Sequence, residues 1–448
     1  METILIKNAT IVNEGCAFDG SVLVGGDFII SVYDSRRPLP AGLSASTVVD
    51  AAGLLLLPGV IDDHVHFREP GLTHKGSIAS ESAAAVAGGV TSFMDMPNTV
   101  PQTVSIEAWS RKMERASATS LSNYAFFVGA TDNNITELQH IDRHRTPGVK
   151  LFMGASTGNM LVDSPETIRR IFGETGLLIA VHAEKEDIIR RNISVMKAEG
   201  SHFPIEAHPL VRSEEACYVA TAEAIETACR TGARLHVLHV STASELGLLD
   251  AKADIKDKPV TAEAAICHLL FADSDYATLG SRIKINPAVK SAADRDALRH
   301  ALCSGKLDVV ATDHAPHLLS EKTGDCLTAA SGAPMIQHSL VAMLDMSSQG
   351  IIPLERVVAL MSHRPAELYR IDRRGYIRPG YYADLTLIDP SAAWSVSEDN
   401  ILYKCGWSPL ENRRFRHAVR QTYVNGRLAY AGGTPLAHGR SMELRFLS

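Results

Sequence analysis

Long apolar runs are missing from this 448-residue sequence. No stretch approaches the ~20 apolar residues that a membrane-spanning helix needs. The first residues, METILIKNATIVNEG, alternate like a β-strand and lack the basic start and apolar stretch of a secretory signal. With 45% hydrophobic and 21% charged residues, the composition is that of a globular protein. We therefore expect a soluble, cytoplasmic protein that has no membrane partner.

Paired cysteines and basic runs are also missing. The seven cysteines are odd in number, are irregularly spaced and form no CxxC pair, which favours free thiols over a disulfide framework. Lys and Arg are scattered, and the formal net charge of −7 is mild. Nothing in this charge pattern is typical of a phosphate-binding patch, so we do not expect nucleic acid as a partner.

What the sequence does contain is an alternation of strand-like and helical segments. Such an alternation predicts an α/β protein with a (β/α)8 TIM-type barrel. The two ends of the chain, residues 1–57 and 373–448, consist instead of short strand-like runs and turns, and VNGR is a strong hairpin signal. We expect the ends to meet in one small β-sandwich domain beside a barrel spanning residues 58–372. The eight apolar runs of the barrel are GVIDDHVHF, GVTSFMDMP, NYAFFVGAT, GVKLFMGAS, GLLIAVHAE, ARLHVLHVS, PVTAEAAICH and LDVVATDHAPH.

Polar side chains gather where these apolar runs end. In a (β/α)8 barrel this is the end of the strands that carries the active site. His64 and His66 end the first run, His182 the fifth, His239 the sixth and Asp313 the eighth. Ordinary core strands do not finish in this way.

These five residues favour a metal site over a set of structural side chains. His64 and His66 are two residues apart, so on a strand they share one face. Two imidazoles at a barrel mouth repel when protonated and leave ring nitrogens unsatisfied when neutral, and a divalent cation resolves both problems. A buried Asp313 carboxylate also needs a partner. Four His and one Asp at four strand ends fit a two-metal site of the hydrolytic type.

Single histidines carry less weight than this set. Taken separately, His182 and His239 are each more often hydrogen-bonded core residues. His236 does not share its direction with His239 by strand alternation, so we assign it no metal.

Lys150 lies inside the fourth run. A protonated ammonium beside two cations is repelled, and burial further lowers its pKa. One reading is a lysine that pairs with a carboxylate or reaches solvent. The other is chemical: a neutral amine can add CO₂, and the resulting carbamate can bridge two cations as a carboxylate does. Spacing alone does not choose between them.

Two long motifs resemble the signatures of dihydroorotase, a member of the amidohydrolase superfamily of cyclic amidases. They are DDHVHFREPG (residues 62–71) and ATDHAPHLLSEK (residues 311–322). MDMPNTVP, GVKLFMG, HAE, HVST and IKINPAVKS follow the order of the site segments of that family, so the resemblance covers essentially the whole chain.

The resemblance implies a reaction and a set of roles. The reaction is the reversible cyclisation of N-carbamoyl-L-aspartate to L-dihydroorotate in pyrimidine (UMP) biosynthesis. Two Zn²⁺ ions would be bridged by carboxylated Lys150 and by a hydroxide, and Asp313 would be both ligand and general acid/base. Arg68 offers a bidentate fork to the substrate carboxylate. The implied metal ligands are His64, His66, Lys150, His182, His239 and Asp313, and the implied substrate contacts are Arg68, Asn98, Asn286, His317 and the loop around Gly332.

Other members of the superfamily are the alternatives. Hydantoinases act on uncharged rings, and they typically have no arginine at position 68 and a tyrosine after the bridging lysine. Allantoinase usually has Asn at position 68. A metal-free, catalytically silent scaffold that binds a transcarbamoylase is a third reading, but all six ligand positions are filled here. A small molecule is thus the expected partner, and a homodimer is compatible with the sequence.

Overall fold

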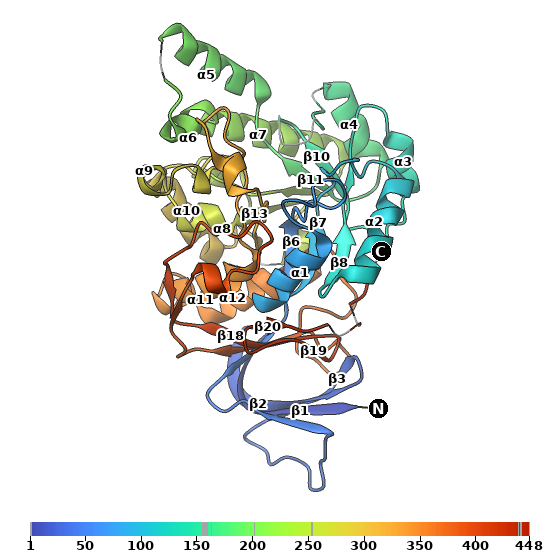
Figure 1. Ribbon diagram of the computed structural model, residues 1–448. Coiled ribbons are helices and arrows are strands. Elements are labelled where there is room, and N and C mark those ends of the chain that lie inside the picture. The colour runs from blue at the N-terminus through green and yellow to red at the C-terminus, as the bar shows by residue number, and fades with distance from the viewer. Residues whose placement is uncertain are drawn as a thin grey trace.

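The centre of the molecule is a parallel barrel with helices around it, seen from the side in Figure 1. The computed structural model describes residues 2–154, 160–162, 164–200, 202–251, 254–437, 439 and 441–447. All neighbouring barrel strands that pair do so in parallel. This is the arrangement that strand–helix alternation favours, because a crossover helix returns the chain to the same end of the sheet.

Each of the eight predicted apolar runs forms one strand of the barrel, and the third run is divided into β8 and β9. The strands lie in a three-stranded and a six-stranded sheet. Phe127 is the single residue between β8 and β9, and a parallel bridge between Val65 and His314 joins the first strand to the last. The predicted (β/α)8 barrel is therefore confirmed. Its strands are β6 (Val60–Val65), β7 (Val90–Asp95), β8 (Asn123–Phe126), β9 (Val128–Gly129), β10 (Val149–Phe152), β11 (Ile179–His182), β12 (Leu235–Val237), β13 (Val260–Ala265) and β14 (Val309–Ala311).

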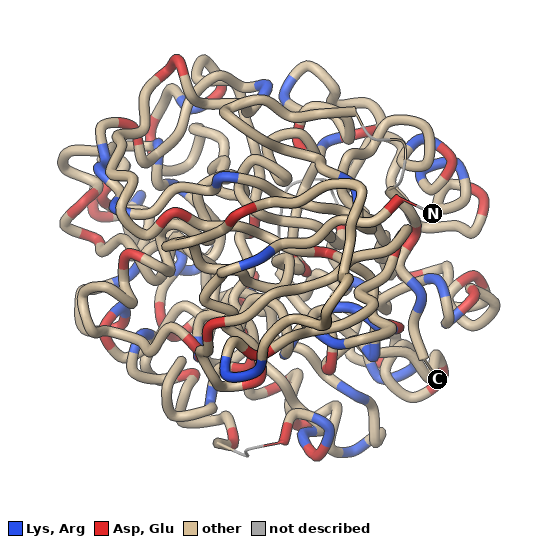
Figure 2. Tube along the Cα trace, turned by 90° about the horizontal axis from the view of Figure 1, so that it is seen from below, with Lys and Arg blue, Asp and Glu red and all other residues tan. Residues whose placement is uncertain are grey.

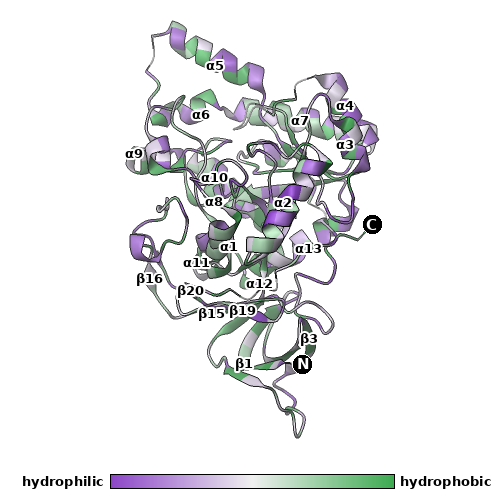
Figure 3. Cartoon of the chain, turned by 45° about the vertical axis from the view of Figure 1, so that its right-hand side comes forward, coloured by the Kyte–Doolittle hydropathy of each residue, from purple (hydrophilic) through white to green (hydrophobic). Residues whose placement is uncertain are grey.

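The helices begin and end at residues that favour termini. Ser77 and Ser213 cap α1 and α7 with their side-chain oxygens, and Gly232 ends α7 at a φ of 71°. In Figure 3, α5 shows hydrophilic and hydrophobic residues side by side, as expected of a helix with one solvent-facing side. No helix among the described residues is long and apolar enough to cross a membrane. The helices are α1 (Ile78–Ala87), α2 (Ile106–Thr119), α3 (Ile135–His140), α4 (Pro165–Glu174), α5 (Glu186–Ala198), α6 (His208–Val211), α7 (Glu214–Thr231), α8 (Ile266–Leu270), α9 (Tyr276–Leu279), α10 (Ala292–Ser304), α11 (Ser339–Ser348), α12 (Leu354–Val358) and α13 (Arg364–Leu368).

Strands from both ends of the chain form one nine-stranded sheet below the barrel in Figure 1. β5 pairs with β1 on one side and with β15 on the other, which joins the N-terminal strands to the C-terminal ones. The predicted VNGR hairpin is present: Val424 pairs with Arg427, and Asn425 and Gly426 both have positive φ. The expected β domain of the two termini is thus confirmed. Its strands are β1 (Thr3–Asn13), β2 (Cys16–Gly25), β3 (Phe28–Asp34), β4 (Thr47–Asp50), β5 (Leu55–Pro58), β15 (Leu385–Asp389), β18 (Ala418–Val424), β19 (Arg427–Ala431) and β20 (Thr434–Pro435), and a separate pair is β16 (Trp394–Ser395) with β17 (Arg414–Phe415).

A second cluster of apolar side chains is buried in the barrel. Ile61, Met94, Phe127 and Tyr369 belong to one buried cluster there. The C-terminal segment also packs against the barrel, because Phe446 belongs to the same cluster.

Surface charge and thiols agree with the sequence expectations. Basic and acidic residues are interspersed over the face seen in Figure 2. All seven cysteines are unpaired.

Candidate metal centre

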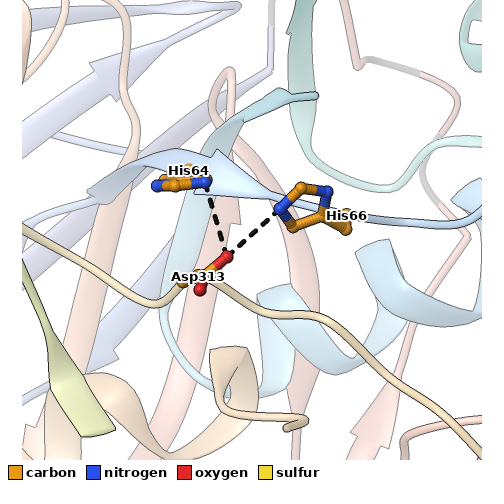
Figure 4. A group of neighbouring side chains, drawn as sticks. All are labelled: His64, His66 and Asp313. Atoms are coloured by element: carbon orange, nitrogen blue, oxygen red, sulfur yellow. Dashed lines mark hydrogen bonds and ion pairs between the residues drawn. The ribbon is translucent and has the colours of Figure 1, made fainter. Parts of the chain in front are cut away.

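His64, His66 and Asp313 meet at the carboxyl end of the barrel strands (Figure 4). The Asp313 Oδ1 atom lies 3.4 Å from His64 Nε2 and 3.1 Å from His66 Nε2. The relative exposure of His64 is 1% and that of His66 is 8%. The structure thus brings together residues from the first and last barrel strands around one point.

The outer nitrogens of these two histidines have oxygen acceptors. His64 Nδ1 lies 2.9 Å from Glu263 Oε1, and His66 Nδ1 lies 2.7 Å from Asn98 Oδ1. Each Nδ1 can therefore donate a proton to its acceptor, and each Nε2 faces Asp313. An acceptor on the outer nitrogen is the arrangement that orients metal-binding histidines.

His182 and His239 face one another on the neighbouring strands. His182 Nδ1 lies 2.9 Å from His239 Nε2, while His182 Nε2 lies 2.9 Å from Glu184 Oε2. Glu184 also forms an ion pair with Arg212. Although burial raises it, Arg212 and His182 lower the pKa of Glu184 to about 2, so this carboxylate is ionised and accepts the Nε2 proton. The lone pair on His182 Nδ1 then points at His239.

Burial keeps the imidazoles in the form that can bind a cation. It lowers the pKa of His66 to about 4, and it lowers the pKa values of His182 and His239 as well. Neutral imidazole is the metal-binding form. The opposite holds for Asp313: burial raises its pKa, but His64 and His66 outweigh this effect and keep the carboxyl ionised.

Lys150 is fully buried on β10, and its Nζ has no hydrogen-bond partner among the described residues. The ammonium group lies 4.6 Å from the centre of the Phe152 ring. Burial lowers the pKa of Lys150 to about 7, so a large share of the amine is neutral near neutral pH. Among the residues that the structure describes, no carboxylate forms the ion pair with Lys150 that the sequence left open.

All six predicted ligands line one cavity of about 20 Å³, together with Asn286, Ser331 and Gly332. That volume is close to one water-sized sphere. Unpaired nitrogen and oxygen atoms around so small a space fit divalent cations, because a cation satisfies every lone pair that the walls leave open. A second cavity of about 320 Å³ shares Asn286 and Ser331 with the first, and Arg212 and Lys284 also line it.

Two of the predicted substrate residues line the small cavity. Asn286 lines the small cavity, and its Oδ1 has no partner in the described part of the chain. Gly332 also lines it, at a φ of 141°, where a Cβ would lie only 2.5 Å from the Ala315 carbonyl oxygen. This close contact and the positive φ require glycine at position 332. Asn98 does not line this cavity, but its Oδ1 atom accepts a hydrogen bond from His66 Nδ1.

Arg68 and His317 lie together beside the cavity. Arg68 Nε donates to the Pro316 carbonyl oxygen, and Arg68 Nη2 lies 3.0 Å from His317 Nε2. His317 Nε2 also lies 3.1 Å from the Ser331 carbonyl oxygen. Burial and the nearby cations Arg68 and Lys75 lower the pKa of His317, so the ring is neutral. Its Nε2 proton then goes to Ser331, which leaves the Arg68 Nη2 donors directed at a ring that offers them no acceptor.

Three site residues have strained backbones. The φ angles of Arg68, His239 and Asp313 are 68°, 39° and 46°. Positive φ is uncommon outside glycine and concentrates at functional sites.

Sequence reasoning missed several supporting residues. Glu263 was not singled out, although a lone glutamate in an apolar strand run is a signal of a buried, partnered charge. Lys75 lies 3.1 Å from His317 Nδ1, and Trp407 Nε1 donates to the His317 carbonyl oxygen. Nothing in the local sequence around Trp407 indicates this contact.

Known proteins share this architecture. Residues 55–429 match the Amidohydrolase family. A dihydroorotase from Halobacterium salinarum is 35% identical over 406 residues, which cover 90% of this chain and 93% of that protein. An allantoinase from Rubrobacter xylanophilus is 31% identical over 96% of this chain and 94% of its own. The solved L-hydantoinase of Arthrobacter aurescens superposes with a TM-score of 0.93 at 27% identity, covering 99% of this chain and 100% of that one. The chain belongs to the amidohydrolase family.

Proposed function

We propose that this protein is a zinc-dependent dihydroorotase, which interconverts N-carbamoyl-L-aspartate and L-dihydroorotate in pyrimidine biosynthesis. The observation that carries the proposal is the convergence of four imidazoles, Asp313 and the unpaired Lys150 amine on one small cavity with Arg68 beside it. The dihydroorotase relatives, at up to 35% identity over most of the chain, support the same reaction.

The ligand set supports two ions. His64, His66 and Asp313 would hold one ion, and His182 and His239 the other. The lowered pKa of Lys150 supports its carboxylation, because only the neutral amine adds CO₂. When bound, the ions would lower the pKa of water and polarise the amide carbonyl.

The protein's own groups supply the proton transfers and the binding of the substrate. Ionised Asp313 would accept a proton from the attacking water and pass it to the leaving ring nitrogen. In the biosynthetic direction it would take the proton from the ureido nitrogen as that nitrogen attacks the side-chain carboxyl group. The cavity of about 20 Å³ is too small for the substrate ring, so we infer that the ring extends into the adjoining cavity of about 320 Å³.

Arg68 is the residue that distinguishes this substrate from uncharged rings. Its guanidinium is buried, lacks an acidic partner within 4.0 Å in the described part of the chain and directs Nη2 at neutral His317. A substrate carboxylate would supply the missing acceptor in a bidentate pair.

The test is a substrate panel with purified, zinc-loaded protein: dihydroorotate, N-carbamoyl-L-aspartate, allantoin and dihydrouracil. We expect interconversion of the first two and little turnover of the others. Turnover of allantoin without turnover of dihydroorotate would identify an allantoinase. A protein that takes up no zinc during loading and turns over none of the four compounds would be identified as a scaffold.

A second test addresses the carboxylate. Arg68→Lys should raise KM for dihydroorotate about tenfold or more, because one ammonium cannot replace the bidentate fork. Arg37→Lys, at an exposed position, is the matched control. An unchanged KM in Arg68→Lys contradicts the carboxylate role.

A further inference from the structure

A second group of ionisable side chains lies inside the barrel, one layer below the metal cavity. Asp63, His236 and Glu263 come from β6, β12 and β13, and each has a relative exposure of 0%. One ligand atom from each lies within 4.8 Å of the others. The separations are 3.6 Å from His236 Nε2 to Asp63 Oδ2 and 3.8 Å from His236 Nε2 to Glu263 Oε2. None of the three belongs to the six ligands of the cavity above.

The hydrogen bonds around His236 fix where its proton lies. His236 Nδ1 lies 2.8 Å from Thr261 Oγ1. The Thr261 hydroxyl donates its single proton to the Leu235 carbonyl oxygen at 3.2 Å, so it can only accept from the ring. His236 Nδ1 is therefore the donor. In the neutral ring, Nε2 is a lone pair that faces two carboxylates.

Both carboxylates have oxygen atoms near His236 Nε2 that form no hydrogen bond among the described residues. Glu263 Oε1 accepts from His64 Nδ1 and from the His239 backbone N–H, at 2.9 and 3.0 Å. Glu263 Oε2, both oxygens of Asp63 and His236 Nε2 have no hydrogen-bond partner among the described residues. One such atom from each of the three residues therefore lies within 4.8 Å of the others, and leaving these buried atoms unpaired in the barrel interior is costly.

We propose that this cluster is a further binding site for a divalent transition-metal ion. The separations of 3.6 and 3.8 Å are too long for N–H···O hydrogen bonds. They are close to the ~3.0–3.7 Å between two ligand atoms that each lie ~2.1 Å from one ion at angles of ~90–120°. A doubly charged ion also neutralises the two carboxylates. One imidazole with two carboxylates is a ligand set that suits Zn²⁺ or Mn²⁺.

Glu263 connects this site to the cavity above. Its Oε1 atom orients His64, and its Oε2 atom faces the deep site. An ion at the deep site fixes the glutamate, and through it the ring of His64. The pairing of β6 with β7 shifts register between Asp62 and Val65, which allows the successive residues Asp63 and His64 both to approach Glu263.

The test counts ions and does not depend on the proposed reaction. The full-length protein is stripped with a chelator, reloaded with Zn²⁺, freed of excess metal and analysed by mass spectrometry of the elements. Asp63→Asn and His236→Gln should each hold one zinc fewer than the wild type. His338→Gln removes another fully buried histidine, away from both sites, and should hold as many as the wild type.

Two further measurements separate the deep site from the upper one. In His66→Ala/His182→Ala one zinc should remain, and adding His236→Gln should remove it. A crystal of the zinc-loaded wild type should give an anomalous peak beside His236 Nε2, which tests the site even where a variant fails to fold. Equal zinc contents in the wild type, Asp63→Asn and His236→Gln, with no such peak, would overturn the proposal and identify a proton shared by the carboxylates instead.

Discussion

The mouth of the barrel and the terminal sheet bury opposite kinds of side chain. At the mouth, imidazoles, a carboxylate and an amine surround a cavity of about 20 Å³. In the terminal sheet, Ile6, Ile11, Leu56 and Leu385 belong to an apolar core, each with 0% exposure. Buried charge needs compensation, whereas buried apolar surface stabilises by itself. The comparison therefore predicts that changes at the mouth affect metal binding and activity, and that changes in the sheet affect stability alone.

The largest effect is expected at Lys150. Lys150→Ala should lose metal together with activity, by roughly a thousandfold or more in kcat/KM, because it removes the group proposed to bridge the ions. Metal analysis and steady-state kinetics measure both. Short carboxylates added to the variant should restore part of each.

Lys258→Ala is the control for this change. Lys258 is also buried, but it pairs with Asp308 at 2.8 Å at the amino-terminal ends of β13 and β14. Removing it should lower stability and leave the metal content unchanged. A Lys150→Ala protein with full metal and full rate would contradict the bridge.

A smaller effect is expected when the acceptor behind His182 is weakened. Glu184→Gln removes the carboxylate that accepts from His182 Nε2. Loss of such an outer partner typically costs 10–100-fold in metal affinity. Competition with a zinc-binding dye measures it, and an affinity equal to that of the wild type would show that Glu184 serves Arg212 alone.

In the terminal sheet, we expect Leu385→Ala to lower stability and to leave activity unchanged. Leu385 is fully buried on β15, so its truncation should lower the free energy of unfolding by about 2–5 kcal/mol through lost burial and the cavity that remains. At 25 °C, kcat/KM should stay within about twofold of the wild type. Urea unfolding and steady-state kinetics on the same preparation measure both quantities. A large loss of kcat/KM in the folded variant would contradict the prediction that changes in the terminal sheet affect stability alone.

The smallest effect concerns acid stability. Burial lowers the pKa of His338 to about 3, whereas the unfolded chain has a value near 6.5. Below pH 6.5 the unfolded state therefore binds a proton at His338, whereas the native state does not. Because of this residue, the free energy of unfolding falls by up to about 1.4 kcal/mol for each pH unit of acidification. Above pH 6.5 the residue contributes no pH dependence.

Urea unfolding of metal-free wild type and His338→Gln between pH 7.5 and 5.5 isolates this effect. The variant should show the shallower fall. Equal slopes for the two proteins would contradict it.

Much of this molecule was predictable from local sequence. Strand–helix alternation predicted the barrel, and VNGR predicted the hairpin of the terminal sheet. Polar residues at the strand ends predicted which end of the barrel carries the site. These patterns depend on neighbours in the chain, so one sequence contains them. The prediction that His64 and His66 share a strand face was likewise local, and both rings do reach Asp313.

The partners of these residues were not predictable in the same way. The acceptor for His64 is Glu263, 199 residues away, and Trp407 reaches His317 across 90 residues. Asp62 binds the Thr312 hydroxyl at 2.6 Å and so connects the first strand to the last, while Asp63 faces the interior. A shift of register in β6, which no period-two pattern contains, accompanies that difference.

The sequence by itself thus determined which chemical groups the protein has and at which end of the strands they stand, because strand period and chain order set both. Only the tertiary structure decided which ring nitrogens carry protons and which lone pairs remain open, because the barrel must close before distant carboxylates meet the histidines.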